Sequence, residues 1–285
     1  MQTKSVFILA LIAIALNLHA QKDDGILLPE FKNLEEYQFR GAVKSIAIKS
    51  YKADEFEDSL KNANQTSPLL HEELYFDSLG RLELALKLNA PSKTAYRYDS
   101  LDRIIEIHYQ SKNICKSGTK EFFEWIPSDS LLQIKTSTDS LCGEGYNILS
   151  LHHKDKQGNI VKAQTIHNGQ ESSIYKYEYD SLNRIVKSQW ISTSSGSVNS
   201  EWLYTYNRTN QITKWIKINE DGDLSESHDF EYDQYGNPIK DRSDNGSTLS
   251  WEYLYDYHGN WVKSIRQKNG LKDIIVIRTI EYYAP

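Results

Sequence analysis

Aromatic and polar residues alternate in short runs along most of this chain, and one run near its middle shows the pattern most clearly. Tyr177 and Tyr179 stand two apart, so in a strand both rings lie on one face. Asp180 follows at once, Asn183 comes three residues later, and residues 185–186 begin a β-branched run. Asp bonds backbone groups in turns, and Asn tolerates a left-handed conformation. The order therefore predicts a strand, a four- or five-residue turn and a second strand.

Relatives of this run recur through the chain. Their central residues are Asp77, Asp99, Asp129, Asp155, Asp180, Asn207, Asp233 and Asp256, at intervals of 22 to 30 residues by subtraction. The residues three further on are, in order, Gly80, Asp102, Leu132, Gly158, Asn183, Asn210, Gly236 and Gly259. All but Leu132 are types that reach positive φ at low cost, so each copy is expected to make the same turn. The aromatic or apolar pairs at Asp129 and Asp155 are displaced, which predicts bulges or longer turns there.

A second set of turn residues lies between the copies. These pairs are Asn168–Gly169, Ser195–Gly196, Asp221–Gly222, Asn245–Gly246 and Asn269–Gly270. Such pairs favour two-residue hairpin turns, so consecutive strands should be antiparallel neighbours. The sequence therefore predicts an all-β fold: a curled antiparallel meander of about eight tandem β-hairpin repeats. All the Asp turns should lie along one edge, the aromatic rings inside, and the first and last strands at exposed edges.

Three regions follow from this reading. Residues 1–20 are expected to be a signal peptide, residues 21–71 an N-terminal segment, and residues 72–285 the β-hairpin repeat domain. Within the N-terminal segment, residues 41–51 predict a first strand, and the polar stretch 53–68 predicts a long loop or insertion.

The repeated pattern resembles the YD repeat of RHS-type proteins. It is carried by LYFDSLGRL at 74–82, YRYDSLDRI at 96–104, YEYDSLNRI at 177–185, FEYDQYGNPI at 230–239 and YLYDYHGNWV at 253–262. In large members of that family such repeats build a β-sheet that winds into a shell, often with a toxin domain attached. The turn chemistry of the copies predicts a structural role for Asp77, Gly80, Asp99, Asp180, Asn183, Asp233, Gly236, Asp256 and Gly259.

The leader predicts export to the periplasm or the extracellular space. Lys4 supplies a positive charge, residues 6–16 form a short apolar core, and residues 18–20 make an acceptable cleavage site before Gln21. An uncleaved anchor is the alternative. After cleavage no membrane span is expected. The formal charge of −6 argues against a nucleic-acid partner, which would require a basic face.

The only two cysteines are Cys115 and Cys142. Disulfides persist outside the cytoplasm, and each cysteine follows the second strand of its copy, near the edge opposite the Asp turns. The sequence therefore predicts a Cys115–Cys142 disulfide.

Candidate chemistry is sparse. The regular tyrosines are typical of core packing, although Tyr235, Tyr257 and Trp261 in turn regions are candidates for stacking on a carbohydrate. His152 and His153 lie close to Asp155, but adjacent residues of a strand point to opposite faces, which makes poor metal geometry. Residues 219–223 resemble a calcium loop only faintly. No catalytic motif, metal site or cofactor site is predicted.

The triplet Asp-Ser-Leu occurs six times, beginning at residues 58, 77, 99, 129, 139 and 180. It resembles an O-glycosylation acceptor of exported Bacteroidota proteins, but Asp and Ser also suit turns. Taken together, the sequence predicts an exported, non-enzymatic and monomeric scaffold or interaction module of the cell envelope. Its expected partner is a protein or a glycan. The alternative is a glycan-binding or glycan-processing protein with an unrecognised site.

Overall fold

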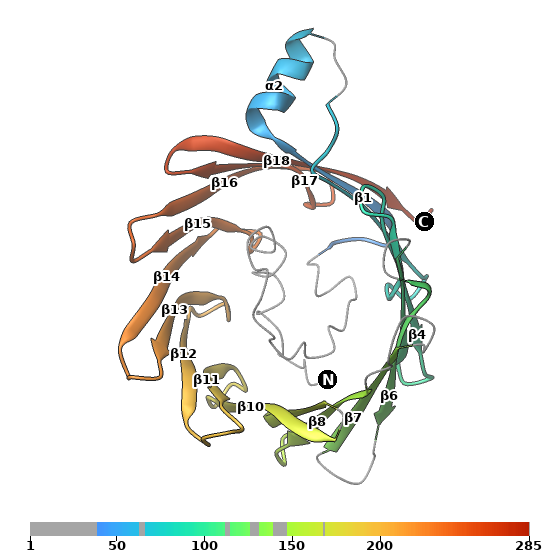
Figure 1. Cartoon of the computed structure of the whole chain (residues 1–285). Helices are drawn as coiled ribbons and strands as arrows, with labels where there is room; N and C mark the ends of the chain where they lie inside the picture. Colours follow the sequence, from blue (N-terminus) through green and yellow to red (C-terminus); the bar gives the residue numbers. More distant parts are fainter. Residues whose placement is uncertain are drawn as a thin grey trace. The chain divides into compact units, whose positions relative to one another are not determined.

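A computed structural model describes residues 39–62, 66–111, 115–125, 131–138, 147–167 and 169–284. These residues form an all-β antiparallel meander of eighteen strands with a single helix (Figure 1). By their contacts they divide into two compact units. The expected signal peptide lies outside the described residues, as do Asp129 and Cys142.

The first unit combines the beginning and the end of the chain. Its elements are β1 (Val43–Lys52), α2 (Ala53–Asn62), β2 (Leu70–Phe76), β3 (Leu82–Lys87), β4 (Ser92–Tyr98), β15 (Pro238–Ser243), β16 (Thr248–Tyr255), β17 (Trp261–Lys268) and β18 (Leu271–Tyr282). Neighbouring strands are antiparallel in the order β15–β16–β17–β18–β1–β2–β3–β4. The core side chains Ile46, Leu74, Leu82 and Ile275 are all 2 % exposed or less.

The second unit contains the middle of the chain. Its strands are β7 (Leu131–Thr138), β8 (Asn147–Lys154), β9 (Ile160–His167), β10 (Gln170–Tyr179), β11 (Ile185–Ile191), β12 (Val198–Tyr206) and β13 (Ile212–Asn219). β5 (Ile104–Ser111), β6 (Cys115–Trp125) and β14 (Leu224–Tyr232) contribute residues to both units, and so does β4 through Tyr98. The antiparallel order from β6 to β14 follows the sequence.

The first and last strands are not edges, contrary to the sequence-based expectation. β1 pairs with β18 from Val43 to Lys52 and with β2 from Ser45 to Ser50. β18 in turn pairs with β17 on its other side. The backbone groups of both strands are therefore occupied, because each lies between two neighbours.

The polar stretch 53–68 was expected to be a loop, but Ala53–Asn62 forms α2 beside β1 and β18 (Figure 1). Asp54 and Glu55 occupy its first turn, where the helix dipole favours negative charge. The Phe56 ring packs on Tyr51, with 5.0 Å between centroids. Lys272 pairs with Glu57 at 2.9 Å. Contacts with the sheet thus stabilise a helix whose polar composition resembles that of a loop.

The turns between the copies differ from the two-residue type expected. Only Asn269 and Gly270 match it among the described turns, since both have positive φ and directly join β17 to β18. The turn at 219–223 has its Gly222 N–H bonded to the Asn219 carbonyl and its Asn219 N–H bonded to the Asp223 carbonyl. The turn at 243–247 repeats this arrangement, and that at 192–197 is longer. In these turns one Gly supplies the left-handed residue, so a pair of left-handed residues is not needed.

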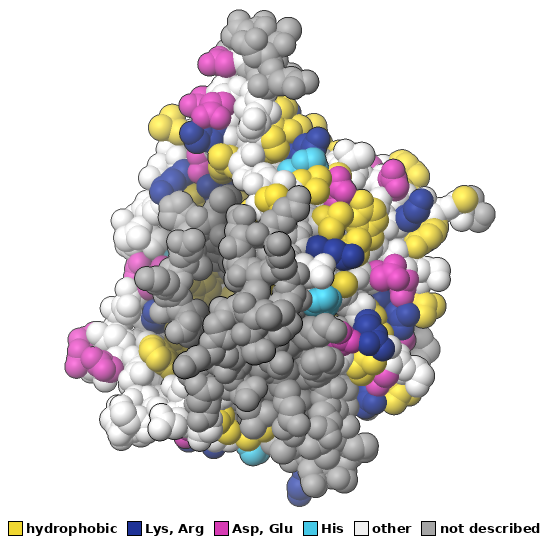
Figure 2. Space-filling model, turned by 45° about the vertical axis from the view of Figure 1, so that its right-hand side comes forward, with side chains coloured by type: hydrophobic (Ala, Val, Ile, Leu, Met, Phe, Trp, Pro, Cys, Tyr) yellow, Lys and Arg dark blue, Asp and Glu magenta, His cyan; other side chains and the backbone are white. Residues whose placement is uncertain are grey.

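Figure 2 shows one face of the molecule. Basic and acidic side chains are interspersed there, with hydrophobic side chains between them. Several opposite charges pair across strands, as Lys187 does with Glu201 at 2.9 Å.

Candidate functional site

The repeated aspartates hold the turns in which they stand. The Asp180 carboxylate accepts the backbone N–H groups of Leu182 and Arg184 through Oδ1, at 2.9 and 3.0 Å. The Asn183 N–H bonds the Asp180 carbonyl, and Asn183 has a φ of +58°. The same backbone bonds are made at residues 77, 99, 155, 207, 233 and 256. The positive-φ residues of these turns are Gly80, Asp102, Gly158, Asn210, Gly236 and Gly259.

The turn at Asp155 does not differ from the others in its backbone hydrogen bonds. A register shift precedes it, as a bulge there was expected to do, but the same shift precedes other turns. It lies at Tyr75/Phe76, His153/Lys154, Glu178/Tyr179, Thr205/Tyr206 and Leu254/Tyr255. The bulge is therefore part of the shared turn geometry.

The second carboxylate oxygen is satisfied in one of two ways in five of the described Asp turns. At Asp155 it accepts the Asn159 side chain at 3.1 Å, and the Tyr179 hydroxyl bonds the Ile160 carbonyl instead. In the first way, Arg184 donates its Nε–H to Asp180 Oδ2 at 2.7 Å. Its Nη1 also reaches Asn210 of the next turn at 3.2 Å, and its guanidinium lies 4.7 Å from the Tyr206 ring centroid. Burial would raise the pKa of Asp180, but the hydrogen bonds from Arg184 outweigh it, and the pKa lies below its ordinary value.

In the second way, Asn stands in place of Arg, and a tyrosine of the next copy donates its hydroxyl to the second carboxylate oxygen. Tyr255 donates its hydroxyl to Asp233, and the Asn237 side chain donates to the Tyr255 hydroxyl at 3.0 Å. At Asp256 the corresponding donor is Tyr282. Burial, followed by this hydrogen bond to Asp256, raises the pKa of Tyr282 to about 12. Both carboxylates are thus engaged within their own turns and by the next tyrosine.

The Asp256 turn also holds the strand entry at residues 39–41. The Asn260 side chain accepts the Arg40 N–H and donates to the Arg40 carbonyl, each at 2.7 Å. It also donates to the Tyr282 hydroxyl at 2.8 Å, and only 3 % of Asn260 is exposed. Gly41 has a φ of +82°, and a Cβ atom there would stand 3.1 Å from His258 Nδ1. The start of β1 is therefore held firmly against this turn.

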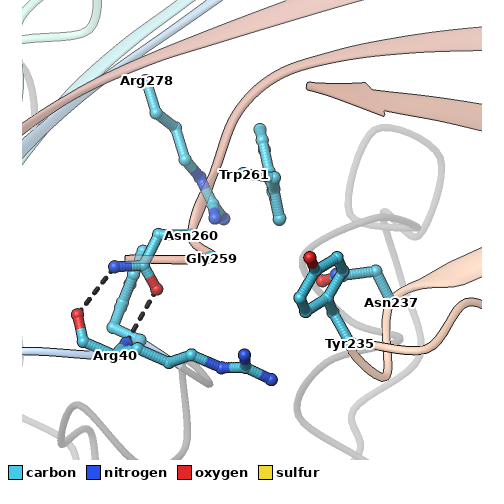
Figure 3. A pocket seen from close by; sticks show the side chains of 8 residues that line it. Arg40, Tyr235, Asn237, Gly259, Asn260, Trp261 and Arg278 are labelled. Atoms are coloured by element: carbon cyan, nitrogen blue, oxygen red, sulfur yellow. Dashed lines mark hydrogen bonds between the residues drawn. The ribbon is translucent and has the colours of Figure 1, made fainter. Parts of the chain in front are cut away.

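The pair of hydrogen bonds between the Asn260 side chain and the Arg40 backbone forms a clamp. A small pocket opens beside this clamp (Figure 3). Its lining residues are Phe39, Arg40, Tyr235, Asn237, Gly259, Asn260, Trp261 and Arg278. All of them belong to the first unit. The enclosed volume is about 10 Å³, roughly the space of one water-sized sphere. The pocket therefore admits about one heavy atom of a ligand, such as a single oxygen, and the rest of the ligand would lie outside.

Two guanidinium groups line the pocket, each against an aromatic ring. The Arg40 guanidinium carbon lies 5.0 Å from the Tyr235 ring centroid, and Figure 3 shows the side chain extending toward that ring. The Arg278 guanidinium carbon lies 3.3 Å from the Trp261 centroid and 5.1 Å from that of Phe39. Aromatic faces attract such cations. The arrangement places two guanidinium groups beside three half-buried rings.

Of the residues proposed from sequence for stacking, Tyr235 and Trp261 are brought together in this pocket. Tyr257 is not, because it is 86 % exposed and packs on His258, with 4.0 Å between centroids. His152 is fully buried, whereas His153 bonds Gln164 at 2.8 Å. Within the described part of the chain, no group of three or more His, Cys, Asp or Glu side chains is arranged to hold a metal ion.

Of the remaining pocket residues, Gly259 was predicted from the sequence for its turn only, and the others were missed. Arg278 had a signal, since it is the one charged residue in the apolar run 274–280 of β18. Arg40 and Asn260 had none, because 220 positions separate them and only the fold makes them neighbours.

No helix in the described ranges is both long and apolar enough to cross a membrane. No protein-family model matches the chain, and no curated protein matches it. The resemblance to YD repeats therefore rests on the residue pattern alone.

Solved structures similar to this chain include a porin-like protein from Bacteroides uniformis, with 10 % identity and a TM-score of 0.48, covering 85 % of this chain and 98 % of that one. A porin-like protein from Bacteroides vulgatus has 12 % identity and a TM-score of 0.37, covering 87 % and 100 %. The Photorhabdus luminescens Tc holotoxin pore has 13 % identity and a TM-score of 0.24, covering 77 % of this chain and 17 % of that chain.

Proposed function

We propose that this chain is an exported, non-catalytic binding module of the cell envelope, built on a YD-repeat-like scaffold of about eight hairpins. The observation that carries the proposal is the pocket beside the Asp256 turn, where Arg40 and Tyr235 project from a rigidly held frame. Binding sites are commonly formed by loops on such a scaffold. Open strand edges are not part of the proposal, since β1 and β18 are paired on both sides.

The engagement of the aspartates favours binding over hydrolysis. A glycosidase needs two carboxyl groups that are available on either side of its substrate bond. The carboxylates of the two turns beside the pocket instead accept hydrogen bonds from their own backbone and from Tyr255 and Tyr282. These contacts give Asp233 and Asp256 a structural duty.

The test uses the mature chain immobilised beside its Arg40→Gln variant. Envelope glycan and peptide fractions are passed over both, and bound material is compared by mass before and after contact. The expected result is saturable retention by the wild type, much weaker retention by the variant, and unchanged ligand mass. Chemically altered ligand, or equal retention by both proteins, would overturn the proposal.

Glycan binding at a second place is a further candidate, favoured by one specific observation. Tyr175, Trp190, Trp202 and Trp215 are half-buried on one face of β10 to β13. Tyr175 lies directly opposite Trp190, and the other rings follow on diagonally placed positions. Lys217 Nζ stands 5.3 Å from the Trp202 centroid. Neutral oligosaccharides should quench tryptophan fluorescence in the wild type and less in Trp202→Ala; no change in either would eliminate this candidate.

A further inference from the structure

We propose that the pocket beside the Asp256 turn recognises a single carboxylate group, presented at the end of a larger ligand and bound by the Arg40 guanidinium. This inference rests on the proposed binding function and names the ligand chemistry of the same site.

The position of Arg40 is fixed at three points. Asn260 clamps its backbone, Tyr235 lies under its guanidinium, and a Cβ atom at Gly259 would stand 3.0 Å from its Nη1. A mobile surface arginine loses side-chain entropy when it binds an anion. Arg40 has lost much of that freedom already, so the cost of binding is reduced.

The positive charge of the Arg40 guanidinium is also available to a ligand. Its guanidinium forms no ion pair with any residue that the structure describes. The two nearby turn carboxylates, of Asp233 and Asp256, are held by other donors. Arg278 adds a second positive charge to the same lining. An entering anion would therefore meet the Arg40 guanidinium as its direct cationic partner.

Size and geometry select a carboxylate among anions. The pocket has a volume of about 10 Å³, so one oxygen of a carboxylate can enter it while the rest of the group lies at its mouth. A guanidinium lying on a ring keeps its N–H edge free in the plane, and that edge matches the two oxygens of a carboxylate. The Asn260 amide is already committed to Arg40 and Tyr282. A phosphate or sulfate can use the same N–H edge, but it is a larger group, and the committed Asn260 amide offers no further donor to its remaining oxygens.

The experiment titrates the mature full chain with acetate, benzoate and glucuronate. Acetamide serves as the neutral control, and phosphate and sulfate as the tetrahedral anions, all at matched ionic strength. Binding is followed through the Trp261 indole N–H resonance. Carboxylates of this size should bind with dissociation constants on the order of millimolar. The Arg40→Gln variant should weaken them about tenfold or more, because a charge-assisted bidentate contact is lost.

The controls separate binding from folding. Arg40→Gln leaves the backbone clamp intact, so its thermal melting should equal that of the wild type. Arg208→Gln, at an exposed turn position outside the pocket, should bind carboxylates like the wild type. Equal binding of acetamide, unchanged affinity in Arg40→Gln, or tighter binding of phosphate would overturn the carboxylate proposal. The proposed binding function is tested separately, by the Arg40-dependent retention of envelope material. That retention can be present even if the carboxylate proposal is wrong.

Discussion

The side-chain amide of Asn260 bonds both backbone groups of Arg40, across 220 positions of sequence. A neighbouring strand would normally bond the N–H and C=O of such a residue, but here a side-chain amide bonds both groups. Because Asn260 is almost fully buried, water does not replace these bonds easily if the amide is removed. The clamp therefore couples the Asp256 turn to the start of β1.

Asn260→Ala should destabilise the fold by about 2–4 kcal/mol, since it leaves the backbone N–H and C=O of Arg40 without their partner. The measurement is the free energy of unfolding from urea titration. Gln211→Ala is the matched control, because Gln211 occupies the same turn position and its side chain bonds only within its own turn. Equal losses in the two variants would contradict the clamp.

Arg184→Lys should destabilise by about 1–3 kcal/mol. Lysine keeps the charge but loses the planar fork that contacts Asp180 and Asn210 and lies on the Tyr206 ring. Arg208→Lys, at an exposed position of the next turn, should change stability little. An unfolding free energy of Arg184→Lys equal to that of the wild type would show that the link between turns contributes nothing.

Stability should fall as the pH drops from about 6.5 to about 4, through His152. Burial, chiefly, lowers the pKa of this fully buried ring to about 4. The unfolded chain therefore binds the proton more tightly than the folded chain, so protonation of His152 favours unfolding. The full free energy of unfolding is present only above the unfolded pKa of this residue. The loss is roughly 3 kcal/mol. His152→Leu should flatten the difference between pH 7 and pH 4.5, whereas His153→Leu should not; identical slopes would refute this.

Gly259→Ala and Gly158→Ala should cost similar stability, about 1–2 kcal/mol each, because both glycines have positive φ, +81° and +88°. They should differ in binding. A methyl group at Gly259 would displace the Arg40 guanidinium, whereas one at Gly158 would meet no other part of the described chain within 4 Å. Carboxylate affinity should therefore fall only in Gly259→Ala. Equal affinity in both variants would contradict the placement of Arg40.

The Cys115–Cys142 disulfide stays a prediction from sequence, since Cys142 lies outside the described residues. The bridge would close a span of 27 residues by subtraction and contribute roughly 3–4 kcal/mol. Thiol titration of the exported, unfolded protein should find no free thiol, and reduction should lower the melting temperature. Two titratable thiols before reduction would rule the bridge out.

The local sequence was sufficient for the Asp-centred turns and the strand order. Asp180 and Asn183 lie three residues apart and meet through bonds that involve no distant segment. Such bonds depend on residue type and spacing, so the sequence pattern predicts a meander directly. Two local predictions failed. Most of the described turns between the copies use a single left-handed Gly in place of a two-residue turn. The helix α2 formed where packing of Phe56 on Tyr51 outweighed a polar composition.

Only the tertiary structure decided what the ends of the chain do. β1 lies between β18 and β2, and pairs Ile46 with Ile280 on one side and with Leu74 on the other. This pairing brings Arg40 to Asn260 and forms the pocket with Tyr235. No local pattern encodes it, because strand pairing between distant segments depends on which backbone edges meet in the fold. The Asp-centred turns could therefore be predicted from the sequence, whereas the candidate site could not.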